Sequence, residues 1–225
     1  MAIRFGTVNP VSFRLGTVTP QRIFMGNKLV WPEFTPVTQT FTTVSAFTYT
    51  IPANCSFIDV ILIGGGGGGA GGGWALAGGG GQGGGWVWTT LVRGVDIPWS
   101  LTSITGVVGD GGAGGGGGAS PGQGSVGSAT SIVAGSLSLQ APGGQNGGGW
   151  GGNGQNGGAA RDGNANGGKD VLLNGITYVG GAAVTSGSGT AGNPPGSGGR
   201  GGNAVIFLGS AGGKGARGEA SFRAY

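Results

Sequence analysis

The sequence predicts a mainly β protein in which short β-strands cap and connect a bundle of polyglycine II-type helices, with essentially no α-helix. Three observations lead to this fold class. Glycine supplies 62 of the 225 residues, whereas proline supplies only 10. Glycine recurs at every third position even in residues 148–163 and 209–218, where only about half of the residues are glycine, and this is the repeat of an extended helix with three residues per turn. The segments between the tracts are rich in β-branched and aromatic residues, and none has the periodicity of an amphipathic α-helix.

A chain that is about one-third glycine and proline is commonly disordered. Two features of the composition oppose disorder here, because only 8% of the residues are charged and 37% are hydrophobic. Disordered chains usually have the opposite balance, with many charges and few apolar side chains. We therefore expect the glycines to belong to ordered structure.

The first 31 residues contain three copies of a short unit. Gly6, Gly16 and Gly26 are ten residues apart, and each follows a run with apolar residues two positions apart. This pattern predicts a short strand followed by a glycine turn in each copy. Units of this size bury no core of their own, so they must pair with each other or with a partner. We expect residues 1–36 to form a β segment for docking and oligomerisation. Its assembly residues are Phe5, Gly6, Leu15, Gly16, Met25, Gly26 and Trp31.

We expect a second domain over residues 37–225, built from strands and glycine tracts. Residues 39–51 alternate apolar side chains with Thr, and residues 52–54 form a turn. Residues 56–63 are apolar at most positions, which indicates a strand that is buried on both faces. Further strands are predicted at 86–92, 100–108, 129–133, 137–141, 171–179, 204–208 and 219–225.

The glycine tracts lie between these strands and share the three-residue phase. Glycine occupies the phased positions from 66 to 84, from 106 to 118, from 148 to 163 and from 209 to 218, with Ala75 and Ala160 filling two gaps. An extended helix with this period makes no internal hydrogen bonds, so each N–H and C=O must find a partner in a neighbouring tract. Only glycine lets the backbones approach closely enough, because a Cβ on an inward face would hold them apart.

The residue inventory argues against catalysis. There is no histidine, and Cys55 is the only cysteine, surrounded by residues that favour burial as a small apolar group. The seven acidic residues are scattered, and no glycine run is followed by the helix that a dinucleotide-binding turn requires. We expect a protein that is not an enzyme, with no catalytic residue, no metal ligand and no cofactor.

Charge and hydropathy also limit the partners. The formal net charge is +4, but the 11 basic residues are spread along the chain and form no basic stripe, so we expect no nucleic-acid partner. The first residues show no secretory signal. The longest apolar run, residues 57–63, includes Asp59 and is too short to span a bilayer, so we expect no membrane insertion.

Four of the six tryptophans border or interrupt glycine tracts, where no ordinary hydrophobic core is expected: Trp74, Trp86, Trp88 and Trp150. Two interpretations remain open for them. They either cap the bundle, or they are exposed and stack on sugar rings or lipid-like molecules of a surface. Since aromatic anchors dominate many binding patches, we take these four as candidate surface-binding residues.

Two parts of the chain resemble a known family. Residues 47–54, the strand at 57–63 and the glycine run after it look like the opening of the glycine-rich domain of phage tail proteins. Residues 107–112 and 212–225 fit the later parts of that domain. The ten-residue units around Gly6, Gly16 and Gly26 resemble the N-terminal segment of minor tail proteins, or tail-tip adhesins, of long-tailed (siphovirus-type) actinobacterial phages.

The resemblance implies a virion component at the tail tip, assembled in the host cytoplasm. Its partners would be other phage tail-tip proteins, further copies of itself in a trimer, and a host cell-envelope molecule such as a glycan or glycolipid. It assigns no binding residues, because the loops that face the host vary within such proteins. Two alternatives remain: a purely structural tail component without receptor contact, and a free glycine-rich ice-binding or cell-wall protein.

Overall fold

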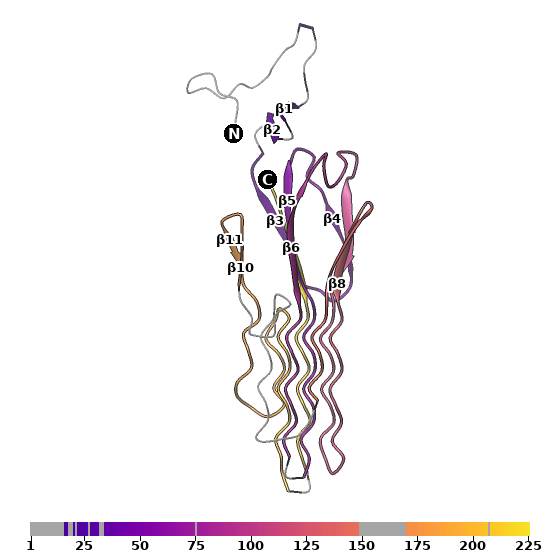
Figure 1. Ribbon diagram of the computed structural model, residues 1–225, viewed down its shortest axis with the longest axis vertical. Helices are drawn as coiled ribbons and strands as arrows, with labels where there is room; N and C mark the ends of the chain where they lie inside the picture. The colour runs from indigo at the N-terminus through magenta and orange to yellow at the C-terminus, as the bar shows by residue number, and fades with distance from the viewer. Residues whose placement is uncertain are drawn as a thin grey trace.

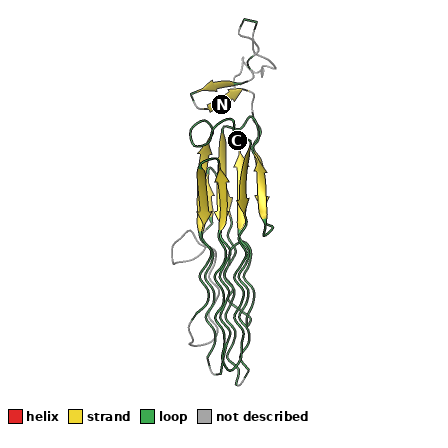
Figure 2. Ribbon diagram, turned by 90° about the vertical axis from the view of Figure 1, so that its right-hand side faces the viewer, coloured by secondary structure: helices red, strands yellow, loops and turns green. Residues whose placement is uncertain are grey.

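The computed structural model describes residues 16–17, 20, 22–26, 28–31, 34–74, 76–148, 170–206 and 208–225. Within these residues the chain is all β, with irregular segments and no helix. The molecule is long and narrow: the strands lie in the upper part, and the glycine tracts run side by side below them (Figures 1 and 2).

Most strands belong to two four-stranded antiparallel sheets, neither of which closes on itself. The first sheet has the order β3 (Val37–Phe41), β12 (Glu219–Ala224), β5 (Phe57–Ile63) and β6 (Trp86–Val92). The second has the order β4 (Ala46–Thr50), β7 (Ser103–Val107), β8 (Thr130–Ala134) and β9 (Leu137–Ala141). Two hairpins stand apart, β1 (Ile23–Met25) with β2 (Lys28–Trp31), and β10 (Val171–Leu173) with β11 (Ile176–Tyr178).

The main hydrophobic core lies between the two sheets. Alternate residues of β5, such as Ile58 and Val60, are fully buried and face residues of the second sheet such as Ile132. Phe222 of β12 stacks on Tyr49 of β4 with ring centroids 4.3 Å apart. Apolar side chains of both sheets therefore hold them face to face as a small sandwich.

The hairpin β10–β11 covers the other face of the first sheet. A second buried cluster there combines residues of β5 and β6 with residues of the hairpin: Ile61, Ile63, Trp86, Val171, Leu173 and Tyr178. This explains why β5 is buried on both faces, as its sequence predicts.

The glycine tracts continue the pairing of the strands. On β5 and β12, Ile63 pairs with Glu219, and three residues further on the Gly66 N–H donates to the Ala216 carbonyl in the same register at 2.8 Å. On β7 and β8, Val107 pairs with Ser131, and the Ser128 N–H donates to the Asp110 carbonyl without a shift of register. The sandwich therefore sets the direction and the relative position of the tracts below it.

The tract at 64–73 is the centre of the bundle. Successive N–H groups donate hydrogen bonds to three different antiparallel tracts, so the choice of acceptor tract repeats every three residues. Positions 65, 68 and 71 donate to the tract at 122–128, positions 66, 69 and 72 to the tract at 210–216, and positions 64, 67, 70 and 73 to the tract at 76–85. The three-residue period that the sequence predicts is thus present in the hydrogen bonding.

Three parallel tracts surround the same centre and donate to its carbonyl groups. They begin at Gly112, Gly144 and Gly199, whose N–H groups donate to Gly66, Gly65 and Gly67 at 2.8–2.9 Å. The six neighbours also bond to each other around the ring, for example from Gly215 to Gly112 and from Gly81 to Gly199. All residues from 64 to 73 are buried, so this lattice is a core made of backbone.

The strand predictions are mostly confirmed. The strands at 86–92 and 137–141 have the predicted bounds, and those near 56–63, 100–108 and 219–225 are shorter by one to four residues. The strand predicted at 129–133 has the predicted length but is shifted by one residue, to 130–134. The single strand predicted at 171–179 is instead a hairpin, because Asn174 has a left-handed φ of 48° and turns the chain. The strand predicted at 204–208 is wrong for the residues that are described there, which form a turn between two antiparallel tracts.

We predict that Gly68→Ala disrupts the bundle. A Cβ at this position would lie less than 3.0 Å from the carbonyl oxygen of Ala113, which belongs to the backbone and cannot rotate away. Since overpacking a close-packed interior is destabilising, we expect a loss of about 2–3 kcal/mol in unfolding free energy. Chemical denaturation measured by circular dichroism checks this value.

The matched control is Gly116→Ala in a neighbouring tract. A Cβ there meets nothing within 4 Å, and the residue is exposed. We expect a change below about 0.5 kcal/mol, as for an ordinary surface substitution. Equal stability of the two variants would contradict the close-packed lattice.

Candidate functional site

The end of the bundle that lies farthest from the sheets is formed by turns between tracts. In one turn the Gly73 N–H donates to the Leu76 carbonyl, and in another the Ser210 N–H donates to the Asn203 carbonyl. The two turns are adjacent, because Gly72 donates to Ser210. A third turn, at 116–122, is attached through Gly118, which also donates to Gly72. We call these three turns the distal tip.

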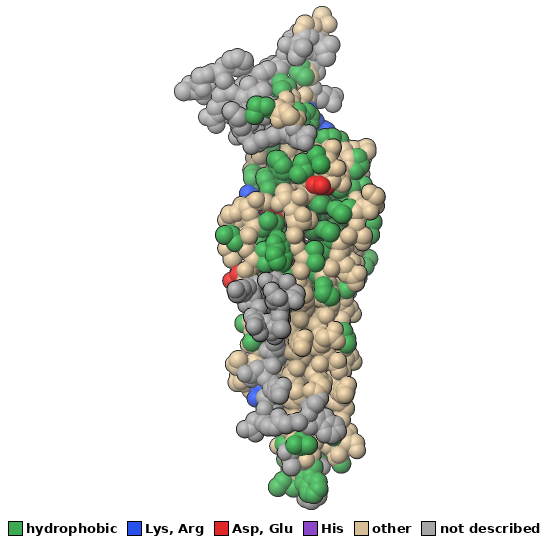
Figure 3. Space-filling view, viewed as in Figure 1, with side chains coloured by type: hydrophobic (Ala, Val, Ile, Leu, Met, Phe, Trp, Pro, Cys, Tyr) green, Lys and Arg blue, Asp and Glu red, His purple; other side chains and the backbone are tan. Residues whose placement is uncertain are grey.

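Large hydrophobic side chains are exposed on the distal tip. The exposed fraction is 62% for Trp74, 70% for Ile206 and 75% for Leu208, and Leu76 and Val205 are exposed as well. Figure 3 shows hydrophobic side chains gathered at this end of the molecule. No residue in the sequence of 72–78, 116–122 or 203–210 carries a charge. Contiguous exposed apolar groups of this kind commonly mark an interaction site.

The structure separates the three candidate tryptophans that it describes. Trp74 lies on the distal tip, whereas Trp88 lies on β6 in the sandwich and is 39% exposed. The interpretation of Trp86 as a surface contact is wrong: only 4% of it is exposed, because the β10–β11 hairpin covers it. Trp150 lies outside the described residues. The structure therefore does not bring the candidates together in one patch.

Sequence reasoning missed the partners of Trp74 on the distal tip, namely Leu76, Val205, Ile206 and Leu208. The run at 204–208 has the composition of a β-strand, and for this reason it was interpreted as one. The position of this run in the sequence nevertheless indicates a turn. The run lies between two glycine tracts, and antiparallel neighbours can be joined only by a reversal of the chain.

The predicted assembly residues fall at the opposite end of the molecule, as far as they are described. Gly16 and Gly26 have left-handed φ values of 62° and 61°, which suits the predicted glycine turns. Met25 is exposed on β1, and Trp31 is half-buried at the end of β2. Phe5, Gly6 and Leu15 lie outside the described residues. The division of the chain at residues 36 and 37 stays a prediction.

The β1–β2 hairpin contacts the sandwich through an aromatic residue of the loop after β6. Phe24 meets Trp99 edge to face, with ring centroids 4.9 Å apart. The Arg22 guanidinium lies 5.4 Å from the centroid of the same ring, and the Arg22 Nε donates to Asn54 Oδ1 at 3.4 Å. These contacts attach the hairpin to the end of the sandwich away from the glycine tracts (Figure 1).

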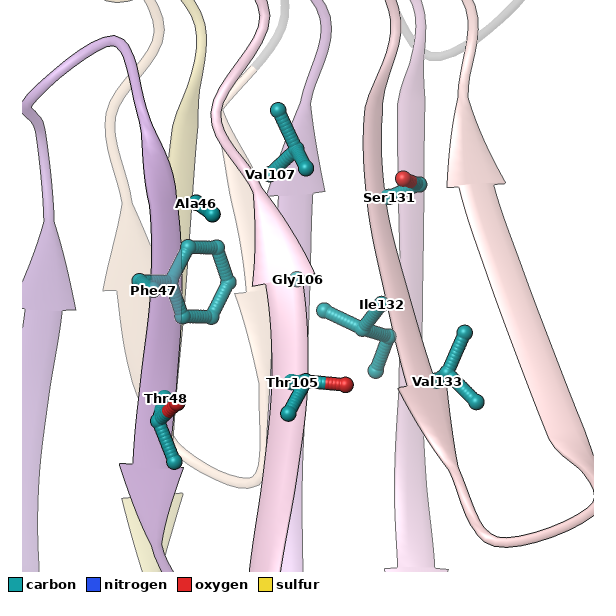
Figure 4. Close-up of a pocket in the computed structure, with 9 residues that line it drawn as sticks. All are labelled: Ala46, Phe47, Thr48, Thr105, Gly106, Val107, Ser131, Ile132 and Val133. Atoms are coloured by element: carbon teal, nitrogen blue, oxygen red, sulfur yellow. The ribbon is translucent and has the colours of Figure 1, made fainter.

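A shallow hollow of about 470 Å³ lies on the second sheet (Figure 4). It is lined by three neighbouring strands, with Gly106 of β7 at the centre between Phe47 and Ile132. The lining residues include Thr48, Thr105, Val107, Ser131 and Val133, and none of the nine is acidic or basic. The hollow therefore offers no acid–base pair for catalysis.

Asp59 on β5 is a buried ionisable side chain that could in principle act as a catalytic acid or base. Its Oδ1 accepts hydrogen bonds from Thr90 Oγ1 and Asn174 Nδ2, both at 2.7 Å, and from the Tyr225 hydroxyl at 3.2 Å. Its Oδ2 lies 3.4 Å from Arg223 Nη1. The carboxylate is completely buried and fully paired. This arrangement holds the turn of the β10–β11 hairpin against the first sheet and gives a substrate no access.

Cys55 is buried, as the sequence predicts, and burial raises the pKa of its thiol. A raised pKa leaves less of the nucleophilic thiolate at neutral pH. Among the described residues, no three His, Cys, Asp or Glu side chains gather in a group that could hold a metal ion. The same residues contain no helical segment with the length and hydropathy that a bilayer crossing requires.

An all-β sandwich extended by a bundle of hydrogen-bonded glycine tracts, with exposed apolar side chains on its turns, defines an all-β, glycine-rich protein. The model of the glycine-rich domain family matches residues 42–225, and the chain belongs to this family.

Two relatives come from mycobacteriophages. The Gene 32 protein of Mycobacterium phage D29 is 44% identical over 214 residues, which cover 93% of this chain and 92% of the relative. The Gene 32 protein of Mycobacterium phage L5 is 44% identical over 131 residues, covering 56% of this chain and 59% of the relative. The predicted resemblance to glycine-rich phage proteins is confirmed to this extent. The names of the relatives specify neither a tail nor a host receptor.

We predict that the Asp59 network contributes to stability. Arg223→Gln leaves the buried Asp59 carboxylate without its counter-charge, and Arg223 itself is mostly buried. Removing one partner of a buried ion pair is strongly destabilising, so we expect a loss of about 2–4 kcal/mol in urea denaturation at pH 7.

The control is Lys214→Gln, which removes the exposed ion pair between Lys214 and Asp110. Exposed pairs contribute little, so we expect a change below about 0.5 kcal/mol. A loss for Arg223→Gln no larger than that of the control would show that the network has no structural role.

Proposed function

We propose that this protein is a structural component of a bacteriophage virion, located at the tail tip, where it presents its distal tip for attachment to the host cell surface. The observation that carries the proposal is the set of exposed apolar side chains on the turns of the glycine bundle. We infer a non-catalytic role, with assembly in the host cytoplasm. The relatives encoded by two mycobacteriophages support a phage origin.

We further propose that the tracts are polyglycine II-type helices. The support is the rotation of hydrogen bonds among three neighbours with a period of three, which such helices produce when they pack side by side. None of the glycines from 64 to 73 has a φ in the left-handed region, in agreement with the extended conformation of that helix. A bundle of this kind is a thin and stiff support, since each inner tract is bonded on all sides.

The two ends of the molecule suit different tasks. The β1–β2 hairpin lies beyond the sandwich, and the distal tip is at the other end (Figure 1). We propose that the first end docks onto other tail-tip proteins through residues such as Met25 and Trp31. The distal tip then faces the cell envelope, where a glycan or a glycolipid is the candidate ligand.

An antibody raised against residues 64–202 tests this function on purified virions. We expect it to label the tail tip in electron micrographs and to block adsorption to host cells by at least about tenfold. Labelling with unchanged adsorption would favour a structural tail component without receptor contact. Virions that bind no antibody at any site would refute the virion location.

We also propose that the protein is a homotrimer, with the outer face of the second sheet in contact with another copy. The outward side chains of β4, β7, β8 and β9 are short and uncharged: Ala46, Thr48, Thr50, Ser103, Thr105, Val107, Ser131, Val133, Ser138 and Gln140. Identical copies can meet at such a face without bringing like charges together. Val107 and Val133 are about half exposed there, which is costly unless a partner covers them.

We predict that the double variant Thr105→Lys, Val133→Lys is monomeric. The two positions are direct neighbours across β7 and β8, so the change places two positive charges in the centre of the face. Multi-angle light scattering should give a trimer mass for the natural sequence and one-third of it for the variant. The control places lysines at Val95 and Leu172, which are exposed elsewhere. A natural protein that stays monomeric at assembly concentrations would contradict the trimer.

A further inference from the structure

The distal tip differs from a sugar-binding surface in the residues that it lacks. Recognition of a glycan requires polar side chains that pair with hydroxyl groups, in addition to aromatic rings. The turns at 72–78 and 203–210 contain Trp, Leu, Val, Ile, Phe, Ala and Gly, and their only side chains with hydrogen-bonding groups apart from Trp74 are Asn203 and Ser210 at the base of one turn. The third turn, at 116–122, adds the exposed hydroxyl of Ser120. Most of the exposed side-chain groups on the distal tip are therefore hydrocarbon.

The shape of the distal tip also limits the partner. The exposed side chains stand on reversals of the chain at the end of the bundle (Figure 1), and between 40% and 75% of each is open to solvent. A rigid protein partner would need a matching cavity for each projecting side chain. The fluid acyl-chain region of a lipid layer adapts to the shape of the exposed side chains. It requires neither charged groups nor hydrogen-bonding groups on the protein.

We propose that the distal tip binds the acyl-chain region of a lipid surface, with Trp74, Leu76, Val205, Ile206 and Leu208 entering it from two adjacent turns. Trp74 adds a ring of the type that concentrates at the boundary between lipid headgroups and acyl chains. The absence of charge from these turns means that the binding depends on apolar burial alone and is insensitive to salt.

This inference rests on the proposed attachment function and specifies its ligand as the lipid part of an envelope molecule. It goes beyond the sequence-based expectation of no membrane insertion, which concerned segments that span a bilayer. Here only the side chains of the turns enter the lipid, and the hydrogen-bonded bundle stops at its surface. The rigid tracts favour such binding, because the turns are held in place and lose little freedom on contact.

Binding of the full chain to phosphatidylcholine vesicles, which carry no net charge, tests the inference. We expect the protein to sediment with the vesicles, with the same bound fraction at 50 mM and 500 mM NaCl. The triple variant Trp74→Ser, Ile206→Ser, Leu208→Ser should bind at least about tenfold more weakly. All three side chains are largely exposed, so we expect the variant to keep the fold, which its circular dichroism spectrum checks.

The matched control removes three equally exposed apolar residues near the sandwich, in the variant Val95→Ser, Leu172→Ser, Val179→Ser. It should bind the vesicles as the natural sequence does. Vesicles with brominated acyl chains should quench part of the tryptophan emission, and this quenching should disappear in Trp74→Phe. Equal binding by the two triple variants would overturn the assignment of the distal tip as the lipid site.

The same variants separate this inference from the attachment function. Virions that carry the tip variant and fail to adsorb, while the natural protein ignores vesicles, would overturn lipid binding and support a protein or glycan receptor. Vesicle binding through the distal tip, together with unchanged adsorption of variant virions, would support the lipid site and refute its role in attachment.

Discussion

The structure depends on one constraint, the hydrogen bonding of a central tract that cannot bond to itself. Residues 64–73 direct every N–H to one of three antiparallel tracts and accept bonds from three parallel ones. The close approach that these bonds require leaves no room for a Cβ at inner positions such as Gly66, where it would meet the carbonyl of Ser197. The buried Ala70 is an exception within this tract. The hydrophobic effect stabilises the β-sandwich, whereas backbone hydrogen bonds and close packing stabilise the glycine bundle.

Such a lattice needs an external template, because polyglycine segments have no side chains to specify a register. The sandwich supplies it. The core residues of β5 and β12 fix the pairing of Ile63 with Glu219, and the tracts continue that register without interruption to Gly72 and Ser210. Apolar burial over a few strands thus determines the alignment of a much longer polar assembly. The same reasoning explains why six of the seven bundled tracts are direct extensions of strands.

The sequence predicts this organisation well where local pattern and tertiary structure agree. The strands at 86–92 and 137–141 and the three-residue period follow from residue types alone. Burial of Trp86 could not be predicted, because it depends on a hairpin about ninety residues away, which a single sequence does not place. The apolar turn at 204–208 was missed for a related reason: its composition favours a strand, and only the antiparallel contact of its flanking tracts requires a reversal.

The wrong strand prediction at 204–208 bears on the proposed binding function. The bundle is stabilised by backbone hydrogen bonds within the tracts. The turns that join the tracts can therefore contain any residues that allow the chain to reverse. Small polar residues meet that requirement with less exposure of apolar surface, as Ser120 does in the third turn. Folding alone therefore gives no reason for Trp74, Ile206 and Leu208 to be exposed together. The lipid ligand that we propose would cover these side chains and would supply that reason.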